Sequence, residues 1–182
     1  CNSEAVKLLV EKGADIHRTT MNDDYLAVKQ SSNAFQICRK YQKEVIDASL
    51  YGWSSLMWAS VVGNLEMVEL LINLGSDIEQ VDINEKSSLV LAVEHGSSKK
   101  VVKCLMEHGA DIYHIDRLGE DALDYATKSS KLELMSVLVD HGPDICKVRE
   151  DGMISAINNG NFEAVKFLIN KGVDVKKARR WR

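Results

Sequence analysis

The chain has 182 residues, of which 45% are hydrophobic and 27% charged, a balance typical of folded globular proteins and not of disordered ones. A single proline excludes collagen-like sequence, and no apolar run reaches the roughly 20 residues that a membrane-spanning helix needs. The formal net charge of −4 gives no electrostatic reason to expect nucleic acid as the main partner. The four cysteines lie far apart, which argues against a zinc site and a dense disulfide framework. We therefore expect an intracellular protein, cytoplasmic in the first instance, with a nuclear location also open.

The strongest internal signal is a repeated segment that ends in Gly, a variable residue, Asp and then Ile or Val. Each copy begins with a short amphipathic helical pattern. The turn glycines are spaced by 62, 34, 33 and 30 residues, and the first gap is about twice the others, which implies a hidden unit. The five copies span residues 4–16, 66–78, 100–112, 133–145 and 163–175.

Four of these copies follow an upstream helical stretch that has its own pattern. The third residue of each stretch is Ser or Asp, whose side-chain oxygen can accept a first-turn N–H as a helix N-cap. The fifth residue is large and apolar and the eighth is Ala, so both lie on one helical face that packs into a core. The N-caps are Ser54, Ser87, Asp121 and Asp151, the large residues Leu56, Leu89, Leu123 and Met153, and the alanines Ala59, Ala92, Ala126 and Ala156.

Two spacings depart from the pattern. Gly96 and Gly109 are 13 residues apart, whereas Gly63 and Gly75 are 12 apart, which places one extra residue between two helices. Ile145 precedes the next upstream stretch by fewer residues than Ile112 does. We expect both changes to lie in surface loops, where length changes cost little.

Together these features resemble the ankyrin repeat family over nearly the whole chain. The family pattern places a TPLHxA stretch ahead of the first helix and a GAD ending after the second. Here the TPLH part is eroded to Ser-Ser-Leu-Met, Ser-Ser-Leu-Val, Asp-Ala-Leu-Asp and Asp-Gly-Met-Ile. The resemblance implies an all-α solenoid of stacked helix-turn-helix units, joined by loops and β-turns and about 5.5 repeats long.

The predicted organisation is one ankyrin-repeat domain over residues 1–182. Residues 1–16 are expected to form a partial repeat with only its second helix, and residues 17–46 a degenerate repeat with an extended second helix. Because the chain opens at a second helix and stops where another repeat could begin, we expect a window from a longer stack. The remaining units are predicted at residues 47–78, 79–112, 113–145 and 146–175, followed by a basic tail at residues 176–182.

No residue pattern indicates catalysis, a cofactor or a metal. The histidines lack the HxxxH or HExxH spacing that favours a metal site. His108 and His141 precede turn glycines, where an imidazole complements the end of a helix dipole. Cys38 and Cys104 align with leucines, so we expect small buried side chains and not catalytic thiolates. We therefore expect a non-catalytic protein that needs no cofactor.

The resemblance also implies where a partner binds. In ankyrin relatives the variable contact positions flank the first glycine of each repeat and close the first helix. We expect Tyr51 and Trp53 to anchor a partner segment, and an alternative of equal weight places both in the core against residues 17–46. Trp58, one residue before Ala59, is expected to be buried. The candidate partner-binding residues are Tyr51, Trp53, Val61, Val62, Ile83, Lys86, His95, Arg117, Lys128 and Lys147.

For function, the resemblance implies an interaction module, a scaffold or adaptor, that binds a protein partner through its concave face and loop tips. A second hypothesis makes the chain a regulatory or targeting segment of a larger enzyme, channel or assembly that contacts its own neighbouring domains. The basic tail favours a weak contact with an anionic surface at most. Its cationic residues are Lys176, Lys177, Arg179, Arg180 and Arg182.

Overall fold

A computed structural model describes residues 52–141 and 145–173, with the side chains of residues 145–151 left out. The described part is built from helices, with one isolated antiparallel β-bridge between Val81 and Ser87. The helices are α4 (Ser55–Val62), α5 (Leu65–Asn73), α6 (Ser88–Glu94), α7 (Lys99–Glu107), α8 (Ala122–Lys128), α9 (Leu132–His141), α10 (Ile145–Asn158) and α11 (Phe162–Asn170).

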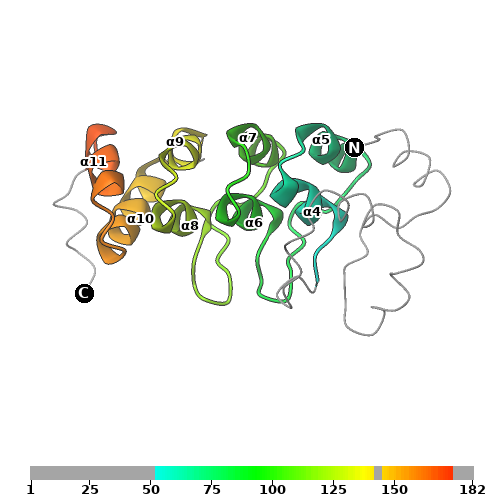
Figure 1. Ribbon diagram of the computed structural model, residues 1–182, viewed down its shortest axis with the longest axis horizontal. Coiled ribbons are helices and arrows are strands. Elements are labelled where there is room, and N and C mark those ends of the chain that lie inside the picture. The colour runs from blue at the N-terminus through cyan, green and yellow to red at the C-terminus, as the bar shows by residue number, and fades with distance from the viewer. Residues whose placement is uncertain (1–51, 142–144, 174–182) are drawn as a thin grey trace.

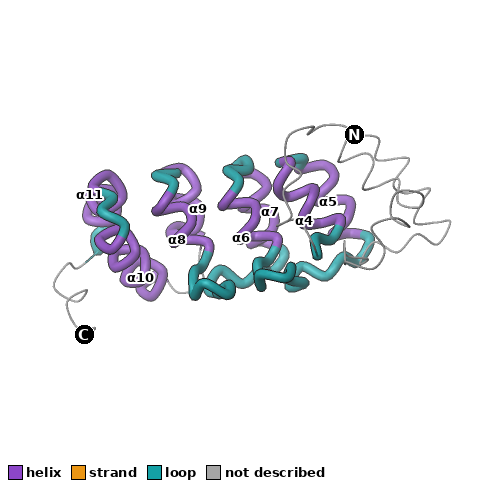
Figure 2. Tube along the Cα trace, turned by 60° about the horizontal axis from the view of Figure 1, so that its bottom comes forward, coloured by secondary structure: helices purple, strands orange, loops and turns teal. Residues whose placement is uncertain are grey.

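These helices form antiparallel pairs that stack side by side (Figure 1). The first helices of the pairs, α4, α6, α8 and α10, pack on one another as an inner row. The second helices α5, α7 and α9 pack as an outer row, and α11 packs on α10. The long loops after α5 and α7 project from the inner row, away from the outer one (Figures 1 and 2). This arrangement is the all-α repeat solenoid that the sequence predicts.

Three of the four inner helices begin directly after the N-cap residue that the sequence predicts. The Ser54 hydroxyl accepts from the backbone N–H of Met57, and Ser87 accepts in the same way from Val90. The Asp121 carboxylate accepts from the N–H of Asp124. The extra residue after Gly96 lies in the turn before α7, as expected. Three of the four eroded TPLH stretches therefore still cap their helices, because Ser or Asp replaces the cap that Thr supplies.

The fourth predicted cap is wrong. α10 runs unbroken from Ile145 to Asn158, so Asp151 lies inside a helix and no loop separates it from Ile145. The shorter spacing leaves too little chain for the loop that precedes α6 and α8. Lys147, Arg149 and Glu150 are good helix formers, so the segment continues as helix instead.

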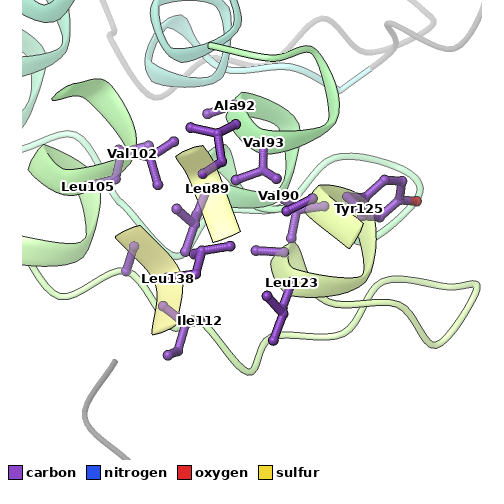
Figure 3. Close-up of a cluster of buried hydrophobic side chains, with 14 of the residues drawn as sticks. Leu89, Val90, Ala92, Val93, Val102, Leu105, Ile112, Leu123, Tyr125 and Leu138 are labelled. Carbon is purple, nitrogen blue, oxygen red and sulfur yellow. The ribbon is translucent and has the colours of Figure 1, made fainter. Parts of the chain in front are cut away.

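The core consists of the apolar positions that recur along the inner row. Leu56, Leu89 and Met153 are fully buried, and Leu123 is nearly so. The four recurring alanines are buried as well, which lets neighbouring helices approach closely. Figure 3 shows how Leu89, Val102 and Leu105 from one helix pair face Leu123 and Leu138 from the next. One continuous cluster therefore joins all four described pairs.

Polar side chains also link the last two described pairs to the pairs before them. The Lys131 ammonium donates to the carbonyl oxygens of Val93 (2.9 Å) and Glu94 (2.7 Å) at the end of α6. Asn161 donates in the same manner to the carbonyl oxygen of Thr127 at the end of α8. These bonds add a donor to carbonyls at helix ends, of which Val93 and Thr127 also accept from the backbone N–H groups of Gly96 and Ser130.

Gly152 gives α10 its close contact with α8. A Cβ at this position would lie 2.5 Å from Cδ2 of the buried Leu123 and 3.6 Å from Cδ1 of Leu168. A glycine inside a helix normally lowers stability, so its presence here is explained by the space it leaves for Leu123.

We expect Gly152→Ala to lower the free energy of unfolding by about 1–2 kcal/mol, because overpacking outweighs the gain in helix propensity. Urea denaturation of the 182-residue chain measures the change. Shortening Leu123 to Val in the Gly152→Ala background should recover part of the loss. A stabilised Gly152→Ala variant would show that α8 and α10 are not in contact at this point.

Residues 1–51 and 174–182 lie outside the described residues. They hold the predicted partial repeat, the degenerate repeat and the basic tail. The predicted boundaries of these units, and of the four repeats between them, stay predictions.

Candidate partner-binding surface

The loop between α5 and α6 is a tight hairpin built around Asp82. One carboxylate oxygen of Asp82 accepts from the backbone N–H groups of Asn84 (2.8 Å) and Lys86 (2.9 Å). The Asp82 N–H donates to the carbonyl of Lys86 at 3.0 Å, next to the β-bridge between Val81 and Ser87. The turn is thus closed by both backbone and side-chain bonds, which is the usual way that Asp stabilises a turn.

Asp116 builds the same hairpin 34 residues later, between α7 and α8. Its carboxylate accepts from the N–H groups of Leu118 (2.8 Å) and Glu120 (3.1 Å), and its own N–H donates to the Glu120 carbonyl. The two turns therefore have one geometry, which holds their exposed side chains in register along the stack.

Each hairpin is also held by an aromatic donor, which is Trp53 just before the N-cap of α4 for one and Tyr125 within α8 for the other. The indole N–H of Trp53 donates to the second carboxylate oxygen of Asp82 at 3.1 Å, and the Tyr125 hydroxyl donates to that of Asp116 at 2.6 Å. Burial alone would raise the pKa of Asp116, but the bonds from Tyr125 and the backbone outweigh it and leave the pKa below its usual value. Burial, and then the bond to Asp116, raise the pKa of Tyr125.

Trp53 is therefore a buried attachment point and not an exposed anchor. Its side chain is 2% exposed, and its ring packs edge-on against Trp58 with centroids 4.8 Å apart. This burial contradicts the exposed anchoring role expected of Trp53. The alternative placed Tyr51 and Trp53 in the core against residues 17–46, and that contact lies outside the described residues. Trp58 is buried as predicted. Val61 is buried too, Val62 is half-buried, and Tyr51 lies outside the described residues.

Two of the predicted lysines meet over one aromatic ring. The ammonium groups of Lys86 and Lys128 lie 4.7 Å and 5.8 Å from the Tyr125 ring centroid, a cation–π arrangement. Lys86 also pairs with Glu94 at 2.6 Å, and Lys128 pairs with Glu120. Each lysine charge is therefore already compensated by a glutamate of the chain. The ion pairs and the ring contacts together fix where the two lysine side chains lie beside Tyr125.

His95 closes α6 beside this cluster. It is the C-cap residue of α6, and its ring lies edge-on to Trp53 with centroids 5.7 Å apart. Burial lowers the pKa of His95, Glu94 opposes that shift, and Lys86 and Lys131 add to it. The His95 imidazole is therefore half-buried, and its lowered pKa favours the uncharged form.

Arg117 joins the two hairpins to each other. Its backbone N–H donates to the carbonyl of Asn84 at 3.0 Å, and its guanidinium pairs with the Glu85 carboxylate at 3.3 Å. His114 adds a bond from its Nε2 to the Glu85 carbonyl at 2.5 Å. The tips of successive hairpins therefore form one connected surface and not two separate loops.

Exposed apolar side chains mark the same tips. Leu118 is 74% and Ile115 59% exposed, and Ile83 is exposed as well. We call Ile83, Ile115, Arg117 and Leu118, with Lys86 and Lys128, the hairpin surface. Of the candidate partner-binding residues, four lie on this surface, namely Ile83, Lys86, Arg117 and Lys128. His95 lies beside it, and the side chain of Lys147 lies outside the described residues. Sequence reasoning missed Ile115, although an apolar residue next to a turn Asp is a usable signal.

The described residues contain no group of three or more potential metal ligands. Cys104 is buried, and burial raises the pKa of its thiol above the usual value, so it lacks thiolate character. His108 sits at the end of α7, where its Nδ1 donates to the Cys104 carbonyl at 2.8 Å. None of the described helices has the length and apolar character needed to cross a membrane.

Comparison with known proteins agrees with this geometry. The chain matches the ankyrin repeat family (ankyrin repeats, 3 copies) over residues 1–82, 56–149 and 89–179. It is 32% identical over 178 residues to a putative ankyrin repeat protein of fowlpox virus, an alignment that covers 93% of this chain and 31% of the viral protein.

Two relatives carry further domains in their names. One is an ankyrin repeat and KH domain-containing protein of Caenorhabditis elegans, 31% identical over 64% of this chain and 4% of its own length. Another is human ankyrin repeat and SOCS box protein 6, 34% identical over 48% of this chain and 22% of its own length. The chain thus spans less than a third of the length of each of these three relatives. It belongs to the ankyrin repeat family, whose stacked repeats generally serve as non-catalytic protein–protein interaction modules.

Proposed function

We propose that this chain is a non-catalytic interaction module that binds a protein partner through the hairpin surface. The observation that carries the proposal is the exposure of Leu118 and Ile115 at 74% and 59% on tips that hydrogen bonds hold rigid. Exposed apolar groups ringed by charge are typical of binding sites. A rigid tip also loses little conformational freedom when it binds.

The partner segment best suited to this surface is apolar at its centre. Ile83, Ile115 and Leu118 supply apolar contacts, and the Arg117–Glu85 pair lies among them. Because the lysines of the hairpin surface are paired with Glu94 and Glu120, a strongly charged partner gains little from them. We infer that shape and apolar contact, more than net charge, select the partner.

The proposal is tested by comparing what immobilised variants of the 182-residue chain retain from a cell extract. Ile115→Asp combined with Leu118→Asp should abolish retention of specific proteins without changing the midpoint of urea unfolding, since both side chains are exposed. Lys103→Asp, on the exposed side of α7, changes the net charge by the same amount and should retain them. Equal retention by all three chains would overturn the proposal.

A second candidate function is that of a targeting or regulatory segment within a larger protein. The comparisons favour it, because the named relatives are several times longer than this chain and two combine ankyrin repeats with a KH domain or a SOCS box. In that case the hairpin surface contacts a neighbouring domain of the same polypeptide. For the basic tail we propose only a weak contact with an anionic surface, and binding through it would weaken as salt is added.

A further inference from the structure

Glu85 has a backbone conformation that glycine adopts at the equivalent positions of the neighbouring repeats. Gly52, Glu85 and Gly119 each lie two residues before an N-cap, and their φ angles are 94°, 63° and 76°. A residue with a Cβ rarely adopts this left-handed conformation, because the Cβ then crowds the backbone. Glu85 is therefore strained at a position where glycine would not be.

The hairpin explains the conformation of Glu85 but not the choice of glutamate. The Glu85 N–H donates to the Asp82 carbonyl at 3.0 Å, and in the second hairpin the Gly119 N–H donates to the Asp116 carbonyl at 2.9 Å. The same turn thus closes with either residue. What the second hairpin lacks at this position is a carboxylate, so the reason for glutamate lies in what that side chain contacts.

Three donors of the second hairpin reach Glu85 or the peptide group before it. The Arg117 Nε–H donates to the Glu85 carboxylate at 3.3 Å, and His114 Nε2 donates to the Glu85 carbonyl at 2.5 Å. The Arg117 backbone N–H donates to the Asn84 carbonyl at 3.0 Å. Because these two carbonyl groups lie on either side of the Glu85 Cα, its left-handed conformation sets the direction of both.

The ion pair does not offset the strain. The side chains of Arg117 and Glu85 are 63% and 54% exposed, and exposed ion pairs contribute little to stability. A non-glycine residue in the left-handed region has a larger cost, and such residues persist mainly where the conformation serves function. The strain at Glu85 therefore points to the hairpin surface and not to the core.

We propose that Glu85 is a positioning residue of the hairpin surface. Its carboxylate fixes the Arg117 side chain, and its backbone aims two carbonyl oxygens at the second hairpin. The tip that carries Leu118 is thereby held in one orientation relative to the first hairpin. The inference rests on the proposed function, since a tip that is already ordered loses less conformational freedom when a partner binds.

Two substitutions in the 182-residue chain separate the strain from the carboxylate. Glu85→Gly and Glu85→Ala both remove the carboxylate, but only Glu85→Gly also removes the strain. Glu120→Ala is the matched control, because it removes a carboxylate that pairs with Lys128 and not with Arg117. Hydrogen exchange of the Arg117 amide, followed by NMR, measures the contact between the hairpins. Residue 85 is not adjacent to Arg117 in sequence, so the substitutions leave the intrinsic exchange rate of this amide unchanged.

We expect the Arg117 amide to exchange at least about threefold faster in both Glu85 variants and at an unchanged rate in Glu120→Ala. The urea midpoint of Glu85→Gly should equal or exceed that of the native chain, because the strain is released. Glu85→Gly should nevertheless retain less of the proteins that the immobilised native chain retains from a cell extract.

Unchanged exchange at Arg117 in both Glu85 variants would overturn the inference. A clearly lowered urea midpoint for Glu85→Gly would also overturn it, since Glu85 would then serve stability. Full retention by Glu85→Gly, where the Ile115→Asp, Leu118→Asp chain retains nothing, would overturn it and leave the proposed function standing. If that double variant also keeps full retention, the proposed function fails, and the exchange rates alone decide whether Glu85 positions the tip.

Discussion

Replacing Trp53 with alanine is expected to lower the free energy of unfolding by about 3–5 kcal/mol, the usual cost of deleting a buried tryptophan. The side chain is 2% exposed and packs on Trp58, and its indole N–H donates to the carboxylate that closes the first hairpin. The variant therefore loses apolar contacts, creates a cavity and frees the Asp82 turn from the segment that leads into α4. Urea denaturation followed by far-ultraviolet circular dichroism measures the change.

Trp53→Phe separates packing from the hydrogen bond. Phenylalanine keeps most of the apolar contact but removes the donor to Asp82, so we expect a smaller loss of about 1–2 kcal/mol. If Trp53→Ala left stability unchanged and abolished partner binding instead, the side chain would be an exposed anchor after all. The burial of Trp53 would then be contradicted.

Replacing Asp116 with alanine is expected to lower the free energy of unfolding by about 2–4 kcal/mol. The buried carboxylate accepts from two backbone N–H groups and from the Tyr125 hydroxyl, and all three donors lose this acceptor together. Asp111→Ala is the matched control, because Asp111 is exposed and its carboxylate accepts from the N–H of Tyr113. We expect that control to change stability by less than about 1 kcal/mol.

The contribution of Asp116 to the free energy of unfolding depends on pH in a defined direction. Its pKa is lower in the folded state than in the unfolded chain, so its stabilising contribution is present above the unfolded value of about 3.9 and is lost as pH falls through the folded value. The stability difference between the native chain and Asp116→Ala should therefore shrink as the pH is lowered from 7 towards 3. A difference that stayed constant over this range would contradict the ionised, hydrogen-bonded Asp116.

The repeat pattern predicts most of the helical stack, because its signals are local. Ser54, Ser87 and Asp121 each lie two residues before an apolar core position, and all three cap helices. Asp151 has the same local pattern and fails, because a cap requires the preceding chain to leave the helical conformation. Too few residues follow Ile145 to form the hairpin that interrupts the helix elsewhere.

The candidate site is harder to predict because it depends on contacts between repeats. The role of Trp53 depends on its hydrogen bond to Asp82, 29 residues away. The sequence alone does not distinguish a buried indole that has a polar partner from an exposed indole. Lys86 and Tyr125 come from different repeats and meet only in the folded stack. The repeat register predicts where Ile83 and Arg117 lie in their repeats. It does not predict that Ile83 is exposed or that Arg117 pairs with Glu85, because both depend on how the hairpins fold.

We propose that a partner binds to the hairpin surface. A photo-crosslinking amino acid at position 118, on the exposed tip, and another at position 103 on the outer helix α7 test this binding. We predict crosslinked adducts to a specific protein, or to a neighbouring domain in a longer polypeptide, from position 118 and none from position 103. Adducts from position 103 in the absence of any from position 118 would show that the partner binds elsewhere.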